Sequence, residues 1–280
     1  MPRHRLTLDA RSPSIIVPLT GRDLPELDEQ IGALNTAGAE FGGAAVGGTS
    51  PDGTTPDAVQ LFDVVEWRVD FYEPFTAGAG SDPSPAVEAL ERISAQLPGL
   101  PVLATFRTRA EGGGAEISPE AYVALAEALA STGLAAAIDV EYRHPLAGDA
   151  IAAVQGHQTS VVASAHDFDA TPPAEEIVER LAAMEDAGAD VAKIAVTPRS
   201  AADVVTLLSA TEQRFRVAGI PLITMSMGGL GAVTRLGGGP FGSSATFATV
   251  GAASAPGQLP AEGVRSALDL LRTGSAPHRT

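Results

Sequence analysis

Short apolar runs alternate with longer amphipathic segments along almost the whole chain. The runs are rich in Val, Ile and Ala, as expected of strands buried on both faces, and the longer segments repeat apolar residues at helical spacing, as in Ile177, Leu181 and Met184. The pattern predicts strands over 14–19, 61–69, 101–106, 136–141, 159–165, 190–196, 221–227 and 243–251, and helices over 23–35, 85–96, 119–132, 145–155, 173–188, 200–213 and 260–271.

This alternation predicts an α/β protein with a parallel sheet, and eight such repeats close most readily into a (β/α)8 TIM barrel. We expect one catalytic domain over 1–280, with a strand or hairpin in 1–13 capping the bottom of the barrel and a tail over 273–280. The stretch 36–59 is rich in Gly, Ala, Thr and Pro, and is interpreted as a flexible insertion on the bottom face. An open doubly wound sheet would need a glycine-rich loop after the first strand, and the sequence there does not supply one.

Composition narrows the class of function. The chain has 280 residues, a formal net charge of -16 and no cysteine. Nucleic-acid binders present basic faces, so no nucleic-acid partner is expected, and disulfides are excluded. No apolar run approaches the roughly 20 residues that span a bilayer, and no signal-type segment is visible, so we expect a cytoplasmic protein without membrane association. No His-x-His or His-Glu-x-x-His motif occurs, so no metal site is predicted.

One basic residue differs from all the others. Of the 18 Lys and Arg residues, the single lysine is Lys193, so the other 17 are arginines. Lys193 lies inside the apolar run 190–196, where an ammonium would lose its hydration. An amine can deprotonate and attack a carbonyl to form an imine, which a guanidinium cannot do. The alternative interpretation is a structural lysine buried against a carboxylate such as Asp190 or Glu141.

Other unusual polar residues follow the carboxyl ends of the predicted strands, where barrel enzymes place their chemistry. His166 is the only histidine at a strand end, and its strand precedes the strand of Lys193. Paired carboxylates could instead build a glycosidase, but that function would leave the lysine without a role. Met225 and Met227, on the seventh predicted strand, could equally be packing residues. The candidates at the other strand ends are Glu66, Arg68, Arg107, Glu111, Glu141, Met225, Met227 and Arg235.

Six motifs, in this order, resemble those of one enzyme family. They are Glu66-Trp67-Arg68-Val69-Asp70, Thr105-Phe106-Arg107 with Glu111-Gly112-Gly113, Ser164-Ala165-His166-Asp167-Phe168, Lys193-Ile194-Ala195-Val196, Ile223-Thr224-Met225-Ser226-Met227-Gly228 and Ser254-Ala255-Pro256-Gly257-Gln258. From about Ile15 to Leu271 the chain is similar to the type I 3-dehydroquinate dehydratases, which are Schiff-base enzymes of the shikimate pathway. Any one motif would be weak evidence, whereas six in order are specific.

The resemblance implies a carbon–oxygen hydro-lyase that removes water, with syn geometry, from the small anion 3-dehydroquinate to give 3-dehydroshikimate. It implies that Lys193 forms a covalent imine with the substrate without any cofactor, that His166 moves protons, and that Glu111 orients this histidine. Arg235 matches an arginine that binds the substrate carboxylate, and the arginines together are expected to keep the free lysine neutral. The other substrate-binding residues implied are Glu66, Arg68, Arg107, Met225, Met227, Ser254 and Gln258.

Three departures from the family pattern and two other functions remain open. Segment 36–59 is longer than is typical of the family, which affects the bottom face only. Pro18 stands where many members carry a small polar residue in the first strand, and Gly228-Gly229 removes side chains from the loop after the seventh strand. A class I aldolase or transaldolase would share the barrel and the imine lysine, and a non-catalytic barrel could keep the pocket for ligand binding. Carbon–carbon cleavage would favour the first, and failure of a ketone with borohydride to label Lys193 would favour the second. A homodimer is expected, because dimers are common in the family.

Overall fold

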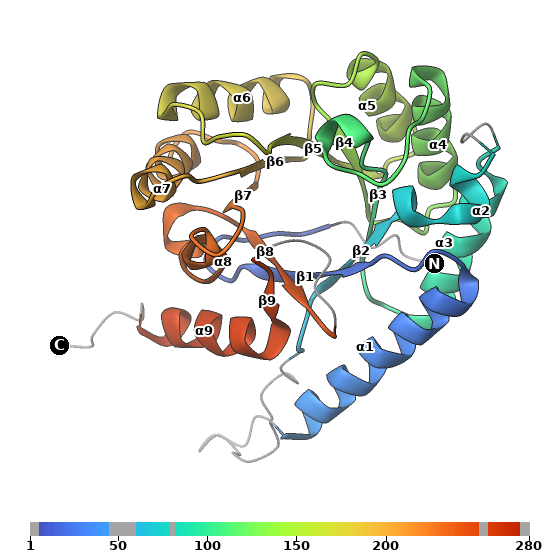
Figure 1. The fold of residues 1–280 in the computed structure, drawn as a ribbon, viewed down its shortest axis with the longest axis horizontal. Coiled ribbons are helices and arrows are strands. Elements are labelled where there is room, and N and C mark those ends of the chain that lie inside the picture. The colour runs from blue at the N-terminus through green and yellow to red at the C-terminus, as the bar shows by residue number, and fades with distance from the viewer. Residues whose placement is uncertain (1–5, 45–59, 79–81, 252–256, 275–280) are drawn as a thin grey trace.

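The computed structural model describes residues 6–44, 60–78, 82–251 and 257–274. Strands and helices follow each other in the order that the sequence pattern predicts (Figure 1). The strands are short, and most of their residues are buried on both faces of the sheet. They are β1 (Ser14–Leu19), β2 (Val64–Arg68), β3 (Val102–Thr105), β4 (Ala137–Glu141), β5 (Ser160–Asp167), β6 (Val191–Val196), β7 (Leu222–Ser226), β8 (Ala245–Thr249) and β9 (Leu259–Pro260).

Neighbouring strands pair in parallel, in the order β7-β6-β5-β4-β3-β2-β1-β8-β9. The ends of this order meet, because Leu222 in β7 forms a parallel bridge with Ser243, two residues before β8. The backbone N–H of Ser244 donates to the Leu222 carbonyl at 2.7 Å. These contacts close β1 to β8 into a ring, with β9 as a two-residue addition beside β8. The predicted (β/α)8 barrel is confirmed.

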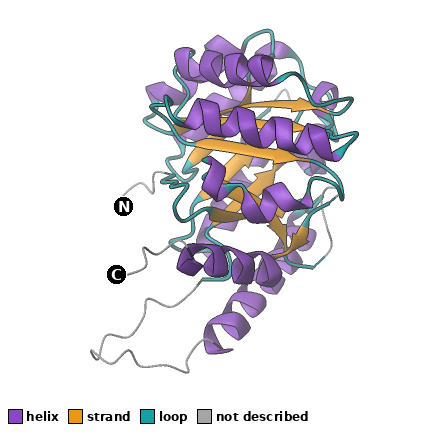
Figure 2. Ribbon diagram, turned by 90° about the vertical axis from the view of Figure 1, so that its left-hand side faces the viewer, coloured by secondary structure: helices purple, strands orange, loops and turns teal. Residues whose placement is uncertain are grey.

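The helices surround the barrel on the outside (Figures 1 and 2). Each long helix turns an apolar face inward, as in α6, where Ile177, Leu181 and Met184 are buried. The start of α7 is fixed by a capping box in which the side chains of Ser200 and Asp203 each accept from the other's backbone N–H. The helices are α1 (Leu24–Ala44), α2 (Glu73–Thr76), α3 (Ser84–Gln96), α4 (Pro119–Ser131), α5 (Ala147–Gly156), α6 (Ala174–Asp186), α7 (Ala201–Phe215), α8 (Ala232–Gly237) and α9 (Ala261–Gly274), with 3-10 turns η1 (Val69–Phe71), η2 (Arg109–Glu111) and η3 (Gly239–Phe241).

Side chains inside the barrel change from apolar at the bottom to polar at the top. Residues two apart on a strand share a face, so the inward series of β2 runs from Val64 through Glu66 to Arg68. The lower inward residues form one apolar cluster, which Leu8 plugs from below. Residues 6–13 of the predicted N-terminal cap form no regular strand or hairpin, but a turn with an isolated bridge between Asp9 and Ser12. Because apolar side chains fill the bottom of the barrel, a substrate can reach polar side chains only at the carboxyl ends of the strands.

The prediction for residues 36–59 is partly wrong, because α1 continues to Ala44. Residues 36–44 are mostly small and lack an apolar period, but they extend a helix that is already nucleated, and nucleation is the unfavourable step. The end of this helix projects from the body of the molecule (Figure 2). Residues 45–59, 1–5 and 275–280 of the predicted insertion, cap and tail lie outside the described residues.

The helix α8 was not predicted, because six residues are too few to show a helical period. Among the described residues, no helix has both the length and the apolar character needed to cross a bilayer.

Candidate active site

A pocket of about 180 Å³ opens at the carboxyl ends of the barrel strands. Of the candidates named from the sequence, all line it except Glu141, which accepts hydrogen bonds from Arg107 and Thr108 beside the pocket, and Ser254, which lies outside the described residues. The lining also contains three aromatic side chains that the sequence did not single out. The full lining is Glu66, Arg68, Phe71, Arg107, Glu111, Gly112, His166, Phe168, Lys193, Ala195, Met225, Met227, Arg235, Phe247 and Gln258.

The amine of Lys193 lies between two carboxylates. Its Nζ donates to Oδ2 of Asp139 at 3.1 Å and lies 3.6 Å from Oε1 of Glu66. It also lies 4.9 Å from the ring centroid of Phe247. The alternative of a lysine buried against a carboxylate is confirmed in kind, but the carboxylates are Asp139 and Glu66 and not Asp190 or Glu141. Lys193 is 3% exposed and lies at the base of the pocket.

The Arg107 side chain, just after β3, forms hydrogen bonds with side chains of β4 and β5. Its Nη1 donates to Ser164 Oγ at 2.9 Å and to Glu141 Oε1 at 3.2 Å, while Nη2 donates to Asp139 Oδ1 at 2.8 Å. Burial opposes the charge of Arg107, but the neighbouring carboxylates raise its pKa. Arg107 therefore lines the pocket with a guanidinium that already binds protein acceptors.

The sequence pattern did not single out Asp139, although it precedes Glu141 by two residues on β4 and so faces inward. Burial alone would raise the pKa of Asp139, but the charges of Arg107 and Lys193 and the hydroxyl of Ser164 lower it. Asp139 is therefore an ionised group that links the lysine to the arginine. Among the described residues, no set of three or more His, Asp or Glu side chains is grouped to hold a metal ion.

His166 is paired with Glu111 at the wall of the pocket. Nδ1 of His166 lies 2.9 Å from Oε2 of Glu111. Burial lowers the pKa of His166 well below 6.5, and the charges of Arg107, Lys193 and Arg68 lower it further. Burial also raises the pKa of Glu111 to about 7. An ionised Glu111 can only accept, so it selects the tautomer with a proton on Nδ1 and leaves Nε2 as an acceptor.

The end of β2 supplies two charged side chains held by protein partners. Thr105 Oγ1 donates to Glu66 Oε1 at 3.0 Å. Arg68 donates through Nε and Nη2 to the two oxygens of Asp70, at 2.8 and 2.7 Å. The Arg68 guanidinium also lies 4.8 Å from the ring centroid of Phe71. The sequence predicted both pocket residues but not the partners that fix them.

Arg235 is a buried guanidinium without a carboxylate partner among the described residues. It is 3% exposed, and its only hydrogen bond among these residues runs from Nη1 to the Met225 sulfur at 3.7 Å. Its Nε has no partner in the same part of the structure, and burial lowers its pKa. Because a buried unpaired charge is costly, this arrangement favours an anionic ligand.

Two consecutive glycines shape the loop that carries Glu111. Gly112 has φ +82°, and a Cβ there would lie 2.4 Å from the ring of Phe168. A Cβ on Gly113 would lie 1.8 Å from the Arg107 carbonyl oxygen. Side chains at either position would push this loop away from the pocket wall, which explains the first two of the three consecutive glycines after Glu111.

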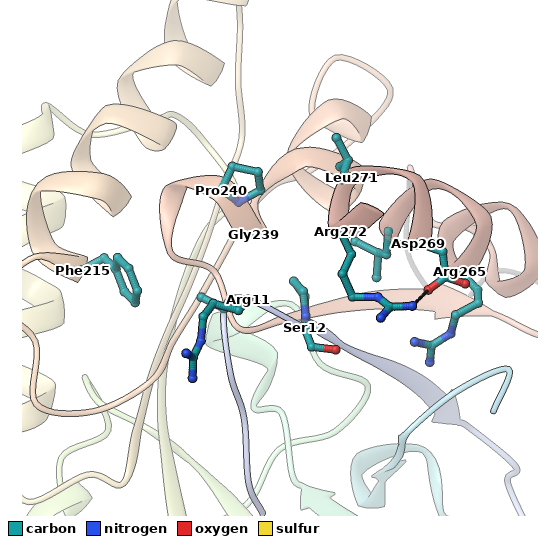
Figure 3. Close-up of a pocket in the computed structure, with 12 residues that line it drawn as sticks. Arg11, Ser12, Phe215, Gly239, Pro240, Arg265, Asp269, Leu271 and Arg272 are labelled. Atoms are coloured by element: carbon teal, nitrogen blue, oxygen red, sulfur yellow. Dashed lines mark ion pairs between the residues drawn. The ribbon is translucent and has the colours of Figure 1, made fainter. Parts of the chain in front are cut away.

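A larger cavity, of about 440 Å³, lies at the opposite end of the barrel (Figure 3). It is formed by the turn before β1, the end of α7, η3 and the second half of α9. Its arginines pair with carboxylates: Arg11 with Asp9, Arg265 with Asp63 and Arg272 with Asp269. No lysine or histidine lines it. The chemistry therefore lies in the smaller pocket.

Relatives of known function agree with this placement. The family described as Type I 3-dehydroquinase matches residues 51–275. A 3-dehydroquinate dehydratase of Listeria welshimeri is 42% identical over 268 residues, covering 95% of both chains. One of Lactiplantibacillus plantarum is 46% identical over 212 residues, covering 75% of this chain and 82% of that protein.

Solved structures give the same answer. The type I 3-dehydroquinate dehydratase of Clostridium difficile, crystallised with covalently modified comenic acid, superposes with a TM-score of 0.82 at 34% identity and 96% coverage of both chains. The enzyme of Geobacillus kaustophilus superposes with a TM-score of 0.80 at 33% identity, covering 94% of this chain and 92% of that one. The chain belongs to the type I 3-dehydroquinases, lyases of the shikimate pathway that convert 3-dehydroquinate to 3-dehydroshikimate.

Proposed function

We propose that Lys193 is the residue that forms the imine in this dehydratase. The observation that carries the proposal is the position of the chain's only lysine at the base of a pocket that also contains His166 and Arg235. The amine would attack the C3 ketone, and loss of the carbonyl oxygen as water would leave a protonated imine. That cation withdraws electrons from C2 and so acidifies the hydrogen there.

The amine must be unprotonated when it attacks the ketone. Its contacts with Asp139 and Glu66 hold the nitrogen in place. His166 would assist imine formation as a proton acceptor that is available near pH 7, because burial lowers the pKa of His166 and keeps the imidazole neutral. A protonated His166 can later return a proton to the departing oxygen.

His166 also fits the role of the base in the elimination itself. Nε2 would remove the C2 proton and deliver it to the C1 hydroxyl, which leaves as water while the C1–C2 double bond forms. One group serving both steps explains a syn elimination. Glu111 would orient the ring through Nδ1. Hydrolysis of the imine by a second water then releases 3-dehydroshikimate and the free amine.

Arg235 would bind the substrate carboxylate, because its buried guanidinium has no carboxylate partner among the described residues. We assign the ring hydroxyls to polar groups of the lining, and the faces of the ring to methionines. Ser254 remains a proposed substrate contact on the strength of the motif alone. These substrate-binding residues are Glu66, Arg68, Arg107, Met225, Met227 and Gln258.

The direct test replaces Lys193 with methionine, which keeps an unbranched side chain but removes the amine. The UV absorbance of the conjugated enone product measures turnover. Lys193→Met should abolish dehydration while the protein stays folded by circular dichroism. Turnover within tenfold of the unmodified enzyme would rule out the imine.

We also propose that the enzyme is a homodimer. Exposed apolar side chains on and beside α8 and α9, which pack against each other, offer surface for a second copy. They are Leu230, Val233 and Leu270. Light scattering should give twice the chain mass, and Val233→Glu should lower it if this surface is used.

A further inference from the structure

Asp70 lies next to the pocket without lining it. It lies in the turn η1, two residues after Arg68 ends β2. Its side chain is 0% exposed. No lining atom of the pocket comes from Asp70, so it cannot contact a substrate there directly.

Four N–H groups converge on this one carboxylate. Oδ1 accepts from Arg68 Nε at 2.8 Å and from the backbone N–H of Arg107 at 3.2 Å. Oδ2 accepts from Arg68 Nη2 at 2.7 Å and from the backbone N–H of Gly114 at 2.9 Å. A carboxylate has about four lone-pair positions, so its capacity is filled.

The first pair of bonds fixes Arg68. Asp70 holds the Nε–Nη2 edge of the guanidinium in a bidentate pair, and Phe71 packs against its face at 4.8 Å. A long arginine side chain has many rotamers. The contacts with Asp70 and Phe71 together select the rotamer in which Arg68 lines the pocket.

The second pair fixes a loop. Arg107 and Gly114 bracket the segment that contains Glu111, and both ends donate to Asp70. Between them, the N–H of Gly113 donates to the Thr108 carbonyl at 2.8 Å and tightens the turn. Asp70 therefore sets where Glu111 stands relative to His166.

We propose that Asp70 is a positioning residue that organises two parts of the pocket at once, the Arg68 guanidinium and the loop that carries Glu111. The inference rests on the proposed roles of His166 and Glu111. Loss of the first part should weaken substrate binding, and loss of the second should slow proton transfer. Partners one step removed from the chemistry typically contribute roughly ten- to hundredfold to activity.

The test compares Asp70→Asn with Asp63→Asn. Asp63 makes the same kinds of bond at the other end of the barrel, accepting from the Ile15 N–H at 2.7 Å and from Arg265 at 2.6 Å. In Asp70→Asn an amide NH₂ would face two N–H donors. We expect kcat/KM to fall by roughly ten- to hundredfold, with KM raised and kcat lowered. Asp63→Asn should lower the melting temperature but change kcat/KM less than twofold.

A second comparison separates the two parts. In an Arg68→Ala background, Asp70→Asn should still lower kcat, because the loop remains affected. If Asp70→Asn does not fold, Asp70→Glu is used instead. The long Arg68 side chain can follow the displaced carboxylate, but the two backbone N–H groups cannot. In Asp70→Glu, kcat should therefore fall more than KM rises.

Two results would overturn the inference. One is kinetic constants for Asp70→Asn or Asp70→Glu that match those of Asp63→Asn at a temperature where all are folded. The other is no added effect on kcat in the Arg68→Ala background. Either result would leave the unmodified enzyme active, whereas failure of the proposed function would appear as an active Lys193→Met variant.

Discussion

Lys193 and Asp139 form a buried ion pair at the base of the pocket, 3.1 Å from Nζ to Oδ2. The other oxygen of Asp139 accepts from Arg107 and Ser164, so the carboxylate sits at a junction between three strands. Asp139 gives the amine, which is buried in the barrel and cut off from water, a hydrogen-bond acceptor.

Asp139→Asn should destabilise the fold by about 3 kcal/mol or more, because removing one member of a buried ion pair leaves the other charge uncompensated. Urea denaturation at pH 7 measures this free energy of unfolding. Asp28→Asn is the matched control, since Asp28 pairs with Arg92 at the surface, and this variant should lose much less stability. Equal losses for the two variants would contradict the role given to Asp139.

His166→Ala should lower kcat by roughly 10²- to 10⁴-fold, the usual range for a general base. Borohydride should still trap a substrate adduct on Lys193, because the amine remains. His157→Ala is the control, as His157 lies at the end of α5, outside the pocket lining. Loss of trapping together with turnover would show that His166 is required for imine formation and does not merely assist it.

Arg235→Met should separate stability from activity. It replaces a buried guanidinium that lacks a carboxylate partner among the described residues with an apolar chain of similar length, so the free energy of unfolding should stay equal or rise. KM should rise and kcat/KM should fall roughly ten- to hundredfold, as expected for a lost charged hydrogen bond. Arg92→Gln removes a surface charge as a control and should change neither constant. A large loss of stability in Arg235→Met would show a structural role instead.

Glu111 should make stability depend on pH. Its pKa is raised from 4.5 to about 7 in the folded protein, so the folded state binds more protons than the unfolded state between these values. The contribution of Glu111 is therefore fully present below pH 4.5 and is lost as the pH rises through about 7. Unfolding free energies of the unmodified protein and of Glu111→Gln, measured at intervals from pH 5 to 8, should differ by an amount that changes in this direction. A constant difference would contradict the raised pKa.

The barrel and most of the pocket could be predicted from the sequence because both depend on local patterns. Alternating runs fix the order of strands and helices, and polar residues at strand ends collect at one mouth of the barrel, as Glu66, His166 and Lys193 do. Asp139 could have been found by following the two-residue period of β4 back from Glu141, and Asp70 stands at the end of the first motif. That Asp139 and Glu66 contact Lys193 could not be predicted, because this depends on which side chains from different strands lie at one level of the barrel.

The end of α1 shows a different limit. Residues 36–44 carry no apolar period, and the pattern that predicts helices reads the buried face of a helix. A helical end that projects from the molecule has little buried face to read. Only the preceding turns, with Leu27, Ile31 and Leu34 buried, could be predicted.

Reductive trapping tests the central claim most directly. Protein incubated with 3-dehydroquinate and borohydride, then digested and analysed by mass spectrometry, should carry one adduct, on the peptide that contains Lys193, and Lys193→Met should carry none. An unmodified Lys193 in protein that still turns over substrate, or an adduct on any other residue, would contradict the account.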